Sequence, residues 1–129
     1  MKKILCSLSA LSICVSLTAC GEKSEVIDPT EAAAEKLSEV YNDCAPEEKK
    51  YVSLGYDGKS LTVDTRGDSE ALSIILTANV YLNLPSSLTE KMSSTRAIDG
   101  TQTQDCGDYT VTWNYHPDDG MKVIYEVTP

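Results

Sequence analysis

The strongest constraint on the fold is the alternation of apolar and polar residues in "YTVTWNYHPDDGMKVIYEV", near the C-terminus. Two runs alternate in the way typical of β-strands with one buried face. Their apolar positions are Tyr109, Val111, Trp113 and Tyr115, then Met121, Val123, Tyr125 and Val127. Only a loop of odd length places both sets on one face, and Asp118, Asp119 and Gly120 suit such a turn. We therefore expect a hairpin with Trp113 opposite Tyr125.

An earlier segment, "YVSLGYDGKSLTV", predicts a second hairpin. Asp57 and Gly58 form a two-residue turn signal, in which both central positions need positive φ. The resulting register places four apolar residues on one face, with Val52 and Leu54 opposite Val63 and Leu61.

Helical patterns occupy two regions. Asp28 as N-cap and Pro29 at the first position begin a helix that Pro46 ends. Its apolar stripe consists of Ala33, Leu37, Val40, Tyr41 and Cys44. Residues 69–84 also suit a helix, capped by Asp68 or Ser69, although the run "SIILTANVYL" has strand propensity as well. The face expected to be buried contains Leu72, Ile75, Leu76, Asn79 and Leu82.

A third, short helix is expected after Pro85. Ser87 and Glu90 form a capping box, which places Leu88 and Met92 inward, and Gly100 supplies the stop. The predicted order is α-β-β-α-α-β-β. An α+β fold follows, with the helices packed on one face of a small antiparallel sheet of two hairpins.

The N-terminus follows the pattern of a bacterial export signal. Lys2 and Lys3 precede an apolar stretch, residues 4–17, which is too short to span a bilayer as a helix. The next residues, "LTAC", end at Cys20 and resemble the bacterial lipobox. The resemblance implies that the Cys20 thiol receives a diacylglycerol thioether, that a lipoprotein signal peptidase cleaves before it, and that the new amine is often acylated.

The resemblance also implies an organisation and a location. We expect residues 1–19 to form the lipoprotein signal peptide and 20–27 a tether, while length and pattern predict a single α+β domain over 28–129. Two or three acyl chains anchor a protein stably. We therefore expect a lipid-anchored protein on the extracytoplasmic face of the cell membrane or of an outer membrane.

Five cysteines are present, and the export signal accounts for three of them. Cys6 and Cys14 leave with the signal and Cys20 takes the lipid, so Cys44 and Cys106 remain as one possible pair. In an oxidising compartment a Cys44–Cys106 disulfide is expected, with two free buried thiols as the alternative.

Charge limits the partners. Twenty acidic and eleven basic residues give a formal net charge of −9 and a pI near 4.4. Acidic surfaces repel phosphate, so nucleic acid is not an expected partner. A cationic extracellular protein fits this charge, and the alternative is that the acidic residues only keep a surface protein soluble.

Two C-terminal segments, "MSSTRAIDGTQ" and "WNYHPDDG", are similar to uncharacterised small secreted proteins and lipoproteins of Gram-positive bacteria. That family carries no assigned activity, so the likeness implies a common fold and no chemistry.

Candidate reactive groups are few. His116 with Asp118 and Asp119 suggests a metal or acid–base cluster, although a tight turn accounts for these residue types. The integrin-binding tripeptide at 66–68 is read as a loop before a helix. We predict no catalytic, cofactor-binding or metal-binding residue. Two residues do not fit the expected elements: Tyr56 is an aromatic residue beside the first turn, and Asn79 is a polar residue on an apolar helix face.

Three functions follow. The first is a non-enzymatic module that binds proteins or scaffolds the envelope. The alternatives are an inhibitor of a cationic extracellular enzyme such as a lysozyme and, with less support, a hydrolase or metal-binding enzyme centred on His116.

Overall fold

The computed structural model describes residues 26–129. The predicted signal peptide and Cys20 lie outside the described residues. Helices and an antiparallel sheet confirm the predicted α+β class. In chain order the elements are α1 (Pro29–Asp43), η2 (Lys49–Tyr51), β1 (Val52–Leu54), β2 (Ser60–Asp64), α2 (Leu72–Tyr81), α3 (Ser86–Ser94), η3 (Ala97–Asp99), β3 (Gln102–Cys106), β4 (Tyr109–His116) and β5 (Gly120–Val127).

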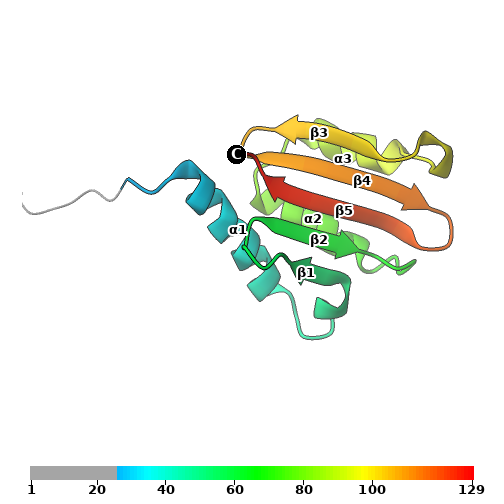
Figure 1. Ribbon diagram of the computed structural model, residues 1–129. Helices are drawn as coiled ribbons and strands as arrows, with labels where there is room; N and C mark the ends of the chain where they lie inside the picture. Colours follow the sequence, from blue (N-terminus) through cyan, green and yellow to red (C-terminus); the bar gives the residue numbers. More distant parts are fainter. Residues whose placement is uncertain (1–25) are drawn as a thin grey trace, which may run out of the picture.

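The five strands are arranged in the order β1-β2-β5-β4-β3, and all neighbours are antiparallel. The last strand of the chain, β5, therefore lies at the centre. Figure 1 views the sheet from its open face, with α2 and α3 behind it. Helix α1 packs on the same side, because the hydroxyl of Tyr109 on the buried face of β4 donates a 3.0 Å hydrogen bond to the carbonyl of Ala33.

The β1–β2 hairpin has the predicted register, with Val52 opposite Val63 and Leu54 opposite Leu61. The turn itself differs from the prediction. Gly58 has φ 71° but Asp57 does not have positive φ. Its carboxylate accepts a 3.0 Å hydrogen bond from the backbone N–H of Lys59 instead. A longer loop around an ordinary turn thus preserves the same pairing.

The β4–β5 hairpin has a loop of odd length, as expected, but its register differs from the prediction by two residues. His116 pairs with Gly120, so Trp113 lies opposite Val123 and not opposite Tyr125. Contacts outside the hairpin support the observed register, because Thr65 in the loop after β2 forms hydrogen bonds with the backbone of Met121. A Cβ on Gly120 would lie 2.3 Å from the Oγ1 of Thr65, so a glycine suits this close approach.

The predicted sheet of two hairpins is wrong in one respect, because β3 adds a fifth strand. It pairs with β4 from Gln102 opposite Trp113 to Cys106 opposite Tyr109. Its sequence, "QTQDC", contains no alternation of apolar residues. An edge strand with half-buried glutamines gives no periodic signal.

Helix α1 begins as predicted, since the carboxylate of Asp28 accepts a hydrogen bond from the backbone N–H of Thr30. Helix α2 confirms the helical interpretation of its segment, but its buried face differs from the expected one. Ile74, Ile75, Ala78 and Asn79 are buried, whereas Leu72 and Leu76 are 42% and 51% exposed.

Helix α3 buries Leu88 and Met92 as expected, but it has no capping hydrogen bond from a side chain. It ends at Ser94, and Gly100 instead ends the short helix η3.

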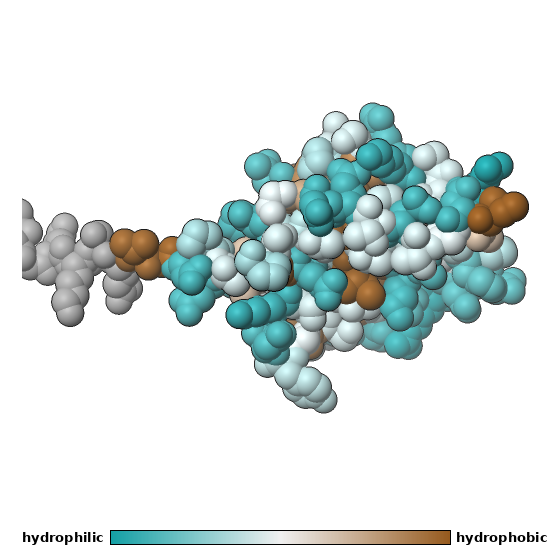
Figure 2. Space-filling view, turned by 45° about the horizontal axis from the view of Figure 1, so that its top comes forward, coloured by the Kyte–Doolittle hydropathy of each residue, from teal (hydrophilic) through white to brown (hydrophobic). Residues whose placement is uncertain are grey.

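The core lies between the helices and one face of the sheet, and Leu37, Leu61, Val111, Val123 and Tyr125 are fully buried in it. The opposite face is mainly polar: Thr62, Thr103 and Thr112 lie on it around Ile124. Figure 2, which is turned by 45° from the view of Figure 1, shows a surface that is mostly hydrophilic or neutral.

The expected Cys44–Cys106 disulfide is not formed, since both residues are free thiols. Cys106 pairs with Tyr109, whose hydroxyl reaches Ala33 in the first half of α1. Cys44 follows the last residue of that helix, about 16 Å further along its axis. Disulfides need Cα atoms about 4.4–6.8 Å apart, so the length of α1 separates the two cysteines.

Candidate functional site

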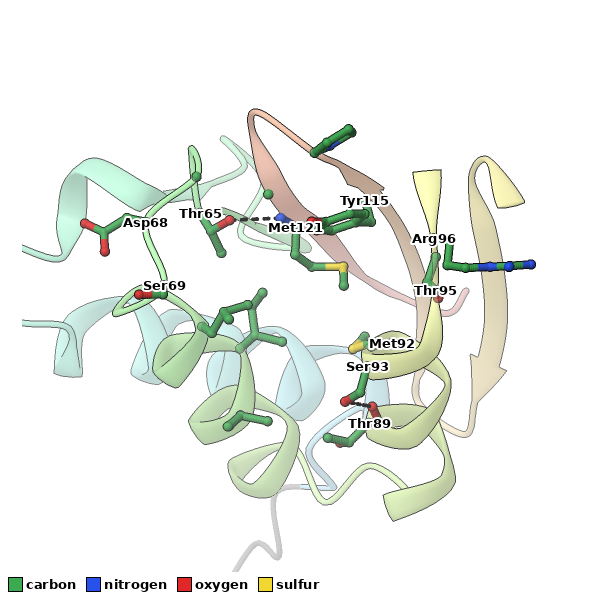
Figure 3. Close-up of a pocket in the computed structure, with 16 residues that line it drawn as sticks. Thr65, Asp68, Ser69, Thr89, Met92, Ser93, Thr95, Arg96, Tyr115 and Met121 are labelled. Atoms are coloured by element: carbon green, nitrogen blue, oxygen red, sulfur yellow. Dashed lines mark hydrogen bonds between the residues drawn. The ribbon is translucent and has the colours of Figure 1, made fainter. Parts of the chain in front are cut away.

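A cleft of about 670 Å³ lies on the helical side of the domain, at the end of the sheet where β4 turns into β5. Helices α2 and α3 form its floor and the loop after β2 closes one side, as Figure 3 shows. Its walls are largely apolar and come from segments far apart in the sequence. The apolar lining consists of Leu72, Ile75, Leu76, Met92, Tyr115, Pro117 and Met121.

The upper wall of the cleft is fixed by contacts between the hairpin tip and the loop after β2. The backbone N–H of Met121 donates a 2.9 Å hydrogen bond to the Oγ1 of Thr65, and the N–H of Thr65 returns one to the carbonyl of Met121. The N–H of Gly67 also bonds to the carbonyl of Asp119. These bonds hold Met121 above the helices, and in Figure 3 its side chain points toward Met92.

Several polar side chains at the rim of the cleft form hydrogen bonds within the protein. The hydroxyl of Tyr51 donates a hydrogen bond to Asp68, which lowers the pKa of that carboxyl. Ser93 bonds to the carbonyl of Thr89. In Figure 3 the side chain of Arg96 points away from the cavity, and so does that of Asp68.

An exposed apolar ridge on α2 continues the cleft. Leu72, Leu76 and Val80 are spaced by four residues, so they lie along one side of the helix. Leu72 and Leu76 also line the cleft, and Val80 is 80% exposed. We call these three residues the α2 ridge.

A row of carboxylates runs along α1, on the other side of α2. Glu31, Glu35, Glu39 and Asp43 are also spaced by four residues, and all are exposed. We call these four residues the α1 acidic row. Lys36 is an exposed basic residue on the same helix.

Tyr81 connects the ridge to the acidic row. It lies at the end of α2 and donates a hydrogen bond to the carboxylate of Glu39. This bond raises the pKa of Tyr81, and the charges of Glu39, Asp43 and Glu35 raise it further. The acidic row therefore meets α2 at Glu39, with Tyr81 between that carboxylate and the apolar ridge.

The sequence-predicted site residues lie in different places. His116 ends β4 with its side chain 56% exposed, and its Nδ1 accepts a 3.2 Å hydrogen bond from the N–H of Asp118. A carboxylate oxygen of Asp119 lies 3.6 Å from the same nitrogen. Residues 66–68 form part of the loop before α2. Cys20 lies outside the described residues.

The two unexplained positions now have distinct environments. Tyr56 is fully exposed at the tip of the β1–β2 hairpin. Asn79 is buried, accepts a 2.7 Å hydrogen bond from the hydroxyl of Tyr125 and donates one of 3.0 Å to Thr89. Its polarity thus links the sheet to α2 and α3.

Within residues 26–129, no three His, Cys, Asp or Glu side chains are arranged to hold a metal ion. In the same part of the chain, none of the helices has the length and apolar character needed to cross a membrane.

The sequence did not predict the cleft or the ridge. The only available signal was that α2 is apolar nearly all the way round, so that it has more apolar side chains than one buried face can accept. Comparisons with known proteins add no further information: no family model matches the sequence, no curated protein is similar to it, and no solved structure matches the fold.

Proposed function

We propose that this chain is a membrane-anchored extracytoplasmic lipoprotein whose folded domain is a non-enzymatic module that binds another protein of the envelope or its surroundings. The observation that carries this proposal is the apolar surface formed by the cleft and the α2 ridge. Contiguous exposed apolar surface on a small soluble domain is typical of an interaction site, because its exposure to water is otherwise unfavourable.

The chemistry of the cleft supports binding over catalysis. Its walls are mainly apolar side chains, and the hydroxyls of Thr65, Thr89 and Thr95 already form hydrogen bonds within the protein. Thr95, for example, accepts a 2.8 Å hydrogen bond from the indole of Trp113 and donates one to the carbonyl of Lys91. Such a site offers burial of apolar surface to a partner. An enzyme centred on His116 has less support, because that imidazole is exposed and bonded to its own turn.

The lipid anchor rests on the "LTAC" segment and is tested at Cys20. Cells that express the full chain are fractionated, and the protein is analysed by mass spectrometry. We expect membrane association and a mass that includes acyl chains, both lost in Cys20→Ser. Cys6→Ser, in the predicted signal, is the matched control. A wild-type protein that is free of lipid and recovered from the medium would overturn the anchor.

The binding surface is tested in the same cells with a photo-crosslinking amino acid. Placed at Val80 on the ridge, it is expected to give a discrete covalent adduct with another protein. Placed at Tyr56, which is even more exposed but lies away from the ridge at the β1–β2 turn, it is expected to give none. Adducts of equal yield at both positions, or at neither, would contradict the proposed surface.

An inhibitor of a cationic extracellular enzyme such as a lysozyme is a second candidate, and the α1 acidic row favours it. We expect such an enzyme to bind the wild-type protein in a salt-dependent manner, since exposed charges are screened by salt. Loss of inhibition when Glu35 and Glu39 are changed to Gln would support this candidate, and unaltered enzyme activity at saturating protein would exclude it.

A further inference from the structure

The proposed binding surface has a shape and a charge pattern that select one class of partner. From Leu72 to Val80 the α2 ridge extends about 12 Å, close to two turns of helix. On one side of it lies the cleft, which can receive large side chains. On the other side lie Tyr81 and then the carboxylates of the α1 acidic row. An apolar surface and a group of carboxylates therefore lie on opposite sides of Tyr81, and they are nearest to each other at Glu39.

Resting on the proposed function, we propose that the partner presents a basic amphipathic α-helix that lies along α2. Its apolar side covers the ridge and inserts one or two side chains into the cleft, and its Lys or Arg side chains face the acidic row. A helix laid in an apolar groove is a recurring mode of recognition, with anchors spaced by three or four residues. Charges at the rim then select the orientation and the sign of the partner.

Charge complementarity decides between this occupant and a second copy of the chain. Each copy carries the same four carboxylates and a formal net charge of −9, so two copies meeting through this surface would bring like charges together. A basic helix is instead attracted by the negative charge of these carboxylates. It also satisfies the apolar ridge, which a purely cationic chain without an apolar side would leave exposed.

The experiment uses the mature protein isolated from cells that express the full chain, in whichever fraction it occurs. Membrane-borne protein is placed in zwitterionic lipid vesicles, with protein-free vesicles as a blank. The probe is a fluorescent peptide of about 18 residues with Leu on one helical face and Lys on the other. Two control peptides carry the same residues in scrambled order, or Glu in place of Lys. We expect saturable binding of the basic amphipathic peptide alone.

Variants of the protein then assign the contact to its two parts. Leu76→Ser with Val80→Ser is expected to weaken binding of the peptide about tenfold or more, because the apolar anchors are lost. Tyr56→Ser is the exposed apolar control and should leave binding unchanged. The triple change Glu35→Gln, Glu39→Gln, Asp43→Asn is expected to weaken binding and to reduce its dependence on salt. The matched triple on the open sheet face, Asp64→Asn, Asp105→Asn, Glu126→Gln, is not.

The outcomes separate this inference from the proposed function. If Val80 crosslinks to a partner in cells but the basic peptide binds no better than its scrambled or acidic control, the partner is not a basic helix and only the inference fails. Binding that is equal in the ridge variants places the peptide elsewhere and also overturns it. A protein that dimerises through the ridge, seen as a mass change that Val80→Ser abolishes, would identify a second copy as the occupant.

Discussion

The hydroxyl of Tyr125 donates a 2.7 Å hydrogen bond to the side-chain oxygen of Asn79, and both residues are buried. Burial raises the pKa of Tyr125, so its phenol stays protonated and remains a donor. The amide of Asn79 in turn donates to Thr89 on α3. One polar connection therefore joins the central strand to both helices that form the floor of the cleft.

Breaking this connection is expected to be costly. Asn79→Leu should lower the free energy of unfolding by about 2 kcal/mol, because it leaves the buried Tyr125 hydroxyl without a partner. Urea denaturation measures the change. Adding Tyr125→Phe removes the orphaned hydroxyl, so the double variant should be at least as stable as Asn79→Leu alone. Strictly additive losses would show that the two side chains are energetically independent.

Stability should fall at alkaline pH through Tyr109. Burial raises the pKa of this residue to about 12, above the usual value near 10 for an unfolded tyrosine. The folded state thus holds the proton more tightly. Its contribution is complete below about pH 10 and is lost as the pH approaches 12.

Across that interval we expect the free energy of unfolding to decrease by about 2 to 3 kcal/mol from Tyr109. Denaturant titrations at fixed pH measure it. In Tyr109→Phe the free energy of unfolding should decrease less between pH 10 and 12. The decrease that remains is attributed to Tyr125, whose pKa is also raised by burial. A wild-type stability that is constant from pH 9 to 12 would contradict the assignment.

Gly120→Ala should disrupt the upper wall of the cleft. At φ 76° a side chain is strained, and its Cβ would meet the Oγ1 of Thr65 at 2.3 Å. We expect a loss of about 3 kcal/mol in thermal or denaturant unfolding. Gly107→Ala is the matched control: φ is 69° there, but no atom lies within 4 Å. It should cost about 1 kcal/mol, from backbone strain alone. Equal losses would show that the contact with Thr65 is unimportant.

Both cysteines of the domain should be alkylated without a reductant. The denatured, unreduced protein is expected to take up two iodoacetamide groups, at Cys44 and Cys106. In the native state Cys44 should react slowly, because burial raises the pKa of its thiol. Cys106→Ser isolates that rate. Peptide mapping that recovers the two cysteines in one crosslinked fragment would refute the free thiols.

His116→Ala should change the free energy of unfolding by no more than about 0.5 kcal/mol, because the side chain is exposed. Zinc titration of the wild-type protein, followed by NMR of the imidazole, gives the sharper measurement. Submicromolar zinc binding that shifts the ring resonances would favour an enzyme or metal-binding function centred on His116 over the proposed one.

The sequence predicts which helices and strands form better than it predicts which residues pair between neighbouring strands. Strand pairing between β1 and β2 follows from local alternation, and a different turn preserves it. The start of β5 contacts Thr65, which lies more than fifty residues earlier. The hairpin sequence alone carries no sign of this contact and places Gly120 wrongly in the loop. The polar strand β3 has no buried alternation and gives no signal.

The candidate site was beyond sequence analysis for a related reason. Because α2 is apolar on nearly every side, its pattern assigns Leu72 and Leu76 to the core as readily as Ile74 and Ala78. Only the packing of α1 and α3 decides which side chains remain in solvent. The cysteines also show that local spacing does not determine tertiary distances. Helical spacing correctly predicts that Cys44 packs against the core, but it contains no information about the distance from Cys44 to Cys106.

The central position of β5 has a consequence for the order of folding. Residues 120–127 are synthesised after the other four strands of the sheet, yet they pair with both β2 and β4 and contribute Tyr125 to the interior. A nascent chain that ends before residue 120 lacks the strand that joins β2 to β4, so the cooperative domain forms only after β5 has been synthesised. For a polypeptide exported as we propose, this order of synthesis keeps the domain unfolded until β5 is available. An unfolded chain can pass through a translocation channel.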